Sequence, residues 1–97
     1  LRGQTLAAVA SNALREWVEE VRRAPLYYGR YYPDPSCCKA ALALSYMLGT
    51  LVRDPKVHGL INSITVESVG GVCAVPIQSI WAAEALLSYI FAVAAAP

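Results

Sequence analysis

Three cysteines are the residues of this sequence with the most definite chemistry. Cys37 and Cys38 are adjacent, and Cys73 lies in the second half of the chain. Neighbouring side chains on a helix point about 100° apart, so at most one of the pair readily reaches Cys73. We therefore expect either one disulfide from Cys73 to Cys37 or Cys38, or three buried reduced cysteines. One histidine and scattered carboxylates supply no metal-ligand spacing, so no metal site is predicted.

A polar turn holds the other group of reactive side chains. Arg53, Asp54, Lys56 and His58 flank Pro55 between two apolar stretches. Pro55 predicts a turn at this point. The simplest interpretation is that these side chains are solvated.

The same segment also resembles a known enzyme signature. Arg53, Asp54 and His58 match the Arg-polar-x-x-x-His pattern of HEPN-type ribonucleases, which are small helical-bundle proteins. The resemblance implies that Arg53 and His58 would face a partner copy and position an RNA phosphate and its attacking 2′-hydroxyl. No phosphate-binding loop, paired-carboxylate site or Ser-His-Asp arrangement accompanies the motif. Our main expectation is that the protein is not an enzyme.

Composition and charge limit the kind of protein that these residues serve. The chain has 97 residues, 57% of them hydrophobic and 15% charged, with a net charge of +1. This composition excludes intrinsic disorder, and it leaves few charged side chains to cover a small domain. All eight Lys and Arg residues lie at or before Lys56, and Glu67 and Glu84 are the only charged residues after it. The second half of the chain must therefore be buried by copies of itself, by lipid, or by both.

The hydrophobic pattern predicts three long helices in a single helical domain over residues 1–97. Residues 5–23 place apolar side chains on one stripe and charged ones on the rest, which is typical of an amphipathic helix. Residues 25–35 form a Tyr- and Pro-rich linker. Residues 36–53 and 76–96 are nearly apolar all round, so we expect both helices to be buried on every side. For residues 60–75 we prefer a helix to about Ser68, with a short strand pair as the alternative.

Aromatic side chains are the expected contacts between subunits. Tyrosine and tryptophan combine a large apolar face with a polar tip, which suits them to interfaces. Glu84 lies in the middle of an apolar helix, so we expect a buried acid that is either paired with Arg53 or Lys39 or protonated. The predicted interface residues are Trp17, Tyr27, Tyr28, Tyr31, Tyr32, Trp81, Tyr89 and Phe91.

Two apolar helical regions joined through a short basic turn resemble the pilins of conjugation-type secretion systems. The resemblance covers about residues 36–96 and concerns architecture. It implies a hairpin of helices that packs into a helical tube, with phospholipid filling gaps between subunits. Arg53, Lys56 and His58 would then face the lumen. The absence of an initial Met fits a mature chain after signal removal.

These observations together predict an all-α fold, with an amphipathic N-terminal helix and two long apolar helices in a hairpin-like unit. We expect a structural subunit that assembles from many identical copies into an extracellular filament, for adhesion or DNA transfer. The expected partners are copies of the chain, lipid, and single-stranded DNA as cargo. We expect the subunit to lie in the membrane before assembly. The alternatives are a capsid subunit of a filamentous virus, a small membrane subunit, and the HEPN-like ribonuclease.

Overall fold

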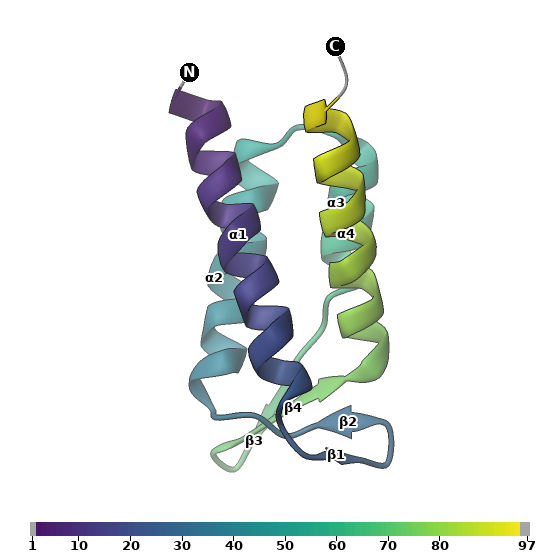
Figure 1. The fold of residues 1–97 in the computed structure, drawn as a ribbon. Coiled ribbons are helices and arrows are strands. Elements are labelled where there is room, and N and C mark those ends of the chain that lie inside the picture. Colours follow the sequence, from purple (N-terminus) through teal and green to yellow (C-terminus); the bar gives the residue numbers. More distant parts are fainter. Residues whose placement is uncertain (1, 96–97) are drawn as a thin grey trace.

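Four helices and a small antiparallel sheet make up the fold of residues 2–95, the part of the chain that the computed structural model describes. The helices run side by side, and the sheet covers one end of the bundle, opposite the two chain termini (Figure 1). The expectation of an all-α fold is wrong, because the segments between the helices form strands. In chain order the elements are α1 (Arg2–Arg22), β1 (Leu26–Tyr27), β2 (Arg30–Tyr31), α2 (Ser36–Leu51), α3 (Pro55–Asn62), β3 (Glu67–Val69), β4 (Val72–Pro76) and α4 (Ile77–Ala95).

Two tight turns build the sheet, whose strand order is β1-β2-β4-β3. Gly70 and Gly71 both have positive φ angles, 59° and 77°, and they join Val69 to its partner Val72. Two consecutive residues at positive φ form the turn whose twist matches paired strands. The preferred helix up to Ser68 is therefore wrong, and the strand-pair alternative is the one that forms. Tyr28 and Gly29 make the corresponding turn between β1 and β2.

The helices form a ring in the order α1-α2-α3-α4. α1 packs against α2 and α4, and α3 packs against the same two helices (Figure 1). α2 and α4 therefore lie diagonally across the bundle, so the expected hairpin of these two helices does not form. α3 stands between them because Pro55 starts a new helix directly after the turn.

The hydrophobic core lies inside this ring and continues onto β4. α1 contributes one stripe, as its amphipathic pattern predicts, although Leu6 at its start is half exposed. α2 and α4 each leave one side exposed, so the expectation that both helices are buried on every side is wrong. In a bundle of four helices, each helix has one side that faces solvent. The largest fully buried side chains are Leu14, Leu48, Ile80, Leu86, Val21, Val57 and Val75.

Candidate functional site

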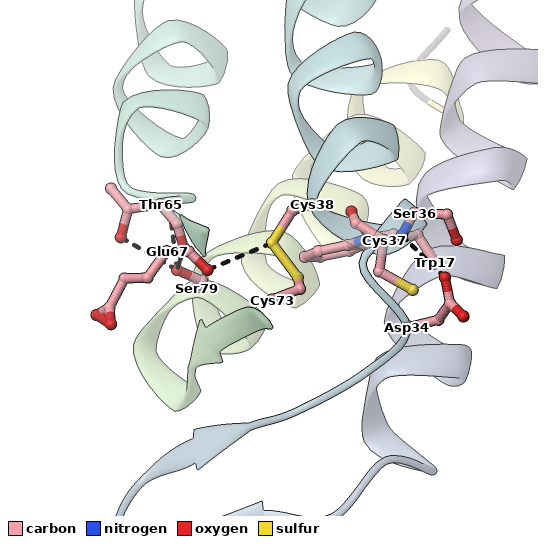
Figure 2. The surroundings of a disulfide bond; sticks show 9 residues. All are labelled: Trp17, Asp34, Ser36, Cys37, Cys38, Thr65, Glu67, Cys73 and Ser79. Atoms are coloured by element: carbon pink, nitrogen blue, oxygen red, sulfur yellow. Dashed lines mark hydrogen bonds between the residues drawn. A yellow bond between two sulfur atoms is a disulfide. The ribbon is translucent and has the colours of Figure 1, made fainter. Parts of the chain in front are cut away.

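The disulfide joins the start of α2 to β4 at the sheet end of the bundle. It links Cys38 and Cys73, one of the two pairings that the sequence left open, and the two Cα atoms are 5.8 Å apart. The Cys37 side chain points away from this bond (Figure 2). Cys37 is a buried free thiol, and burial raises its pKa, so it is a poor nucleophile. Trp17 fixes this corner by donating its indole N–H to the carbonyl oxygen of Cys37 at 2.8 Å.

The polar turn between α2 and α3 is held by its own hydrogen bonds. Asp54 is the N-cap of α3, and its Oδ1 accepts the backbone N–H of Lys56 at 2.9 Å. Nε2 of His58 lies 2.9 Å from the carbonyl oxygen of Val52. Arg53 and His58 line one surface hollow of about 610 Å³. The structure thus brings together two of the three residues expected to face a lumen, while the lumen itself stays a prediction.

Tyr89 of α4 contacts this turn, and the sequence analysis did not predict that contact. Its hydroxyl donates to Oδ2 of Asp54, and the Lys56 ammonium lies 4.9 Å from the centre of its ring. These contacts, led by the Tyr89 hydrogen bond, hold the pKa of the Asp54 carboxyl below its usual range. The same bond raises the pKa of Tyr89. Tyr89 is half-buried inside the chain, so it is a poor interface residue.

The two acidic residues of the second half both pair with arginines of the first half. Glu84 meets Arg22 of α1 at 2.7 Å, and its side chain is 41% exposed. The expectation of a buried acid paired with Arg53 or Lys39 is therefore wrong, because the ring places this face of α4 against α1. Glu67 accepts the Nε–H of Arg30 at both oxygens, which raises the pKa of that guanidinium. Each of the two carboxylates therefore has an arginine partner.

The predicted interface aromatics divide into two groups. Trp17 is 4% exposed and lies in the core, so it cannot contact another subunit in this fold. Tyr31 is half-buried against the same core. The exposed members of the set are Tyr27, Tyr28, Tyr32, Trp81 and Phe91. Tyr27 and Tyr28 pack edge to face at the tip of the first hairpin, with ring centres 4.4 Å apart.

The outward side of α2 carries the apolar residues that the sequence analysis missed. Leu42 is 66% exposed and Tyr46 is 76% exposed, with Met47 beside them. These residues were expected to be buried because no charged stripe interrupts the helix. Lys39 and Thr50 lie on the same side of α2 as Tyr46, at helical spacing, and they could have marked this side as solvent-facing. We call Leu42, Ala43, Tyr46 and Met47 the α2 face.

The outward side of α4 is different in shape and is bordered by Glu84, which lines the same surface hollow as Ser88. Trp81 is 59% exposed, and Ala85, Ser88 and Ala92, which continue its side of the helix, are small, while Phe91 and Val93 are exposed beside them. Because α2 and α4 are diagonal in the ring, these two outward sides point away from each other (Figure 1). We call Trp81, Ala85, Ser88 and Ala92 the α4 face.

No family model, curated protein or solved structure matches this chain. Among the described residues, no helix is both long enough and apolar enough to cross a bilayer. Residues 2–95 also contain no cluster of three or more histidine, cysteine or acidic side chains that could hold a metal ion.

Proposed function

We propose that this protein is a structural subunit that assembles with copies of itself into an open chain. The α2 face of one copy packs against the α4 face of the next. The observation that carries the proposal is the pair of exposed faces without charged side chains of their own on diagonally opposite helices, bordered by Lys39 on α2 and by Glu84 on α4. A contiguous apolar surface on a small protein marks a contact site, because exposing it to water is unfavourable.

The two faces complement each other in shape. The α2 face presents large side chains, led by Leu42, Tyr46 and Met47, whereas the α4 face has alanine and serine next to Trp81. Large residues interdigitate best with small ones on a facing helix. Packing α2 on α4 therefore leaves fewer voids than packing either face on a copy of itself.

A contact between two different faces gives a directional assembly. Each copy has one α2 face and one α4 face, so every added subunit exposes a fresh face at the end of the chain. Such contacts form a filament when the rotation between copies does not close a ring. The Cys38–Cys73 disulfide supports assembly in an oxidising compartment, such as outside the cell. Arg53, Lys56 and His58 are then the residues to locate relative to the filament axis.

Mixing two blocked variants tests this proposal. Tyr46→Glu places a charge on the α2 face, and Ala85→Arg places one on the α4 face; both positions are exposed, so folding should be kept. Electron microscopy should show filaments for the wild type and for an Asn62→Lys control on exposed α3. Each blocked variant alone should be monomeric by light scattering, and an equimolar mixture should give dimers through the one intact pair of faces.

Other outcomes would identify a different assembly. If each blocked variant alone forms dimers, the faces pair with themselves and the head-to-tail contact is wrong. If the wild type is monomeric at micromolar concentration, the structural proposal fails. Nucleic acid retained in the particles, seen by absorbance at 260 nm, would favour a capsid subunit.

The ribonuclease stays a second candidate because of one observation. Arg53 and His58 line the same hollow, at the start of a helix and on the surface of the chain. Against it, His58 already contacts the Val52 carbonyl, and the hollow adds no basic side chain beyond Arg53. Cleavage of a single-stranded RNA by the wild type, lost in His58→Ala with filaments unchanged, would establish the nuclease.

A further inference from the structure

The end of the bundle opposite the sheet contains an apolar pocket that lies outside the α2 face and the α4 face. It has a volume of about 490 Å³, within the range of roughly 300–1,000 Å³ typical of small-molecule sites. α1 contributes Ala7, Ala8 and Ser11 to the wall, and α4 contributes Tyr89 to Phe91 together with Val93. Val52, Asp54 and Val57 complete it from the α2–α3 turn and α3.

Side-chain size explains why the pocket forms at this end. Near the sheet, α1 fills the bundle interior with Leu14, Trp17 and Val21, all buried. One to two turns earlier the corresponding positions are two alanines and a serine, which leave space between α1 and α4. The pocket is therefore a consequence of small residues on one wall and of ordinary apolar residues on the other.

A buried hydroxyl in the wall has nothing to bond. Ser11 is 1% exposed, and its Oγ has no hydrogen-bond partner among the described residues. The other buried serine, Ser79, shows the usual arrangement, because its hydroxyl accepts the Thr65 N–H at 2.9 Å and donates to the Thr65 carbonyl (Figure 2). Leaving a buried polar group unpaired is unfavourable, so a partner for Ser11 is expected from a molecule in the pocket.

Asp54 determines which polar group can enter beside Ser11. Its carboxylate lies in the wall and is kept ionised by the hydrogen bonds from Tyr89 and from the backbone of Lys56. A ligand with its own carboxylate would meet this like charge at the edge of an apolar wall, where repulsion is screened less than in open water. A neutral hydroxyl meets no such repulsion, and it can exchange hydrogen bonds with Ser11.

We propose that this pocket binds a single-chain amphiphile with a neutral hydroxyl head, such as a fatty alcohol or a monoacylglycerol. The chain lies against the alanine, valine, isoleucine and phenylalanine side chains, and the hydroxyl bonds Ser11. This inference does not depend on the assembly proposal, because it rests on the interior of one chain.

Equilibrium dialysis with two radiolabelled probes of equal chain length tests the site. Decanol should bind saturably to the full chain at one site per subunit, and decanoate should bind at least about tenfold more weakly at neutral pH. Ala8→Phe, which fills the pocket from an exposed position, should abolish decanol binding. Asn62→Phe, on exposed α3 outside the pocket, should leave it unchanged.

Two further variants separate the roles of the polar residues. Ser11→Ala should weaken decanol binding by roughly threefold to tenfold while leaving the melting temperature equal or higher, since it removes an unpaired buried group. Asp54→Asn keeps a good N-cap and should bring decanoate binding close to that of decanol. Undetectable decanol binding, unchanged binding in Ala8→Phe, or equal binding of both probes by the wild type would each overturn the proposal.

Discussion

Removing the Cys38–Cys73 disulfide should cost this protein a large part of its stability. The bond closes a loop with a sequence separation of 35 residues, and it joins α2 to β4, two elements that also pack against each other. For a loop of this length, the lost freedom of the unfolded chain corresponds to about 4 kcal/mol. Domains of this size have total stabilities of roughly 5–15 kcal/mol. We therefore expect the Cys38→Ala/Cys73→Ala variant to fold only marginally.

Urea denaturation followed by circular dichroism measures this effect. A loss of about 4 kcal/mol should lower the midpoint by roughly 2–3 M urea. The matched control is Cys37→Ala, which removes a sulfur atom of equal burial without opening a loop and should cost about 1 kcal/mol. Wild-type protein in reducing agent should resemble the double variant. If the double variant loses no more free energy of unfolding than twice the Cys37→Ala loss, restriction of the unfolded chain is not what the bond contributes.

Three further predictions concern single positions. Trp17→Phe leaves the Cys37 carbonyl without its indole donor and should lower the free energy of unfolding by about 1–3 kcal/mol, measured by urea titration; an unchanged midpoint would show that water replaces the indole. Gly71→Ala places a Cβ in a turn with φ of 77° and should lower the free energy of unfolding by about 1–2 kcal/mol. Gly59→Ala, at an exposed position of α3, should raise it by up to about 1 kcal/mol. Thermal melts that rank the two variants the other way would contradict the turn assignment. The contacts that lower the pKa of Asp54 in the folded state stabilise the fold at pH values above the pKa of the unfolded chain, which is near 4. This stabilisation is lost as the pH falls through the lower pKa of the folded state. Tyr89→Phe should therefore make stability fall less steeply as the pH drops below about 4, and an unchanged slope would remove the Tyr89 hydroxyl as the cause.

Local patterns in the sequence were sufficient for some elements. The apolar stripe over residues 5–23 corresponds to α1, because an amphipathic helix marks its buried side with its own polar residues. Pro55 indicated the turn after α2 for a similar reason, since a proline restricts the backbone next to it whatever the rest of the chain does. β1 and β2 were not predicted and the β3–β4 pair was only the alternative, because each strand is only two to five residues long. The turn that pairs β3 with β4 depends on the positive φ angles of Gly70 and Gly71.

The outward faces and the ion pairs required the tertiary structure. α2 and α4 are apolar on most sides, so their sequences contain no polar stripe that indicates which side faces solvent. The packing of the neighbouring helices in the ring determines which side is exposed. For the same reason the sequence predicted a buried Glu84, while the packing of α4 on α1 gives it Arg22. The pocket at the end opposite the sheet depends on small residues of α1 lying opposite α4, a relation between segments far apart in the chain.

The sequence by itself determined the separation of charge between the two halves, the first helix, the polar turn and the pair of disulfide candidates. These follow from residue type and near-neighbour spacing, which act within a few residues. The tertiary structure alone decided that Cys38 and not Cys37 reaches Cys73, and that Tyr46 is exposed. Each of these depends on how a helix is rotated about its axis, and only packing against the other elements sets that rotation.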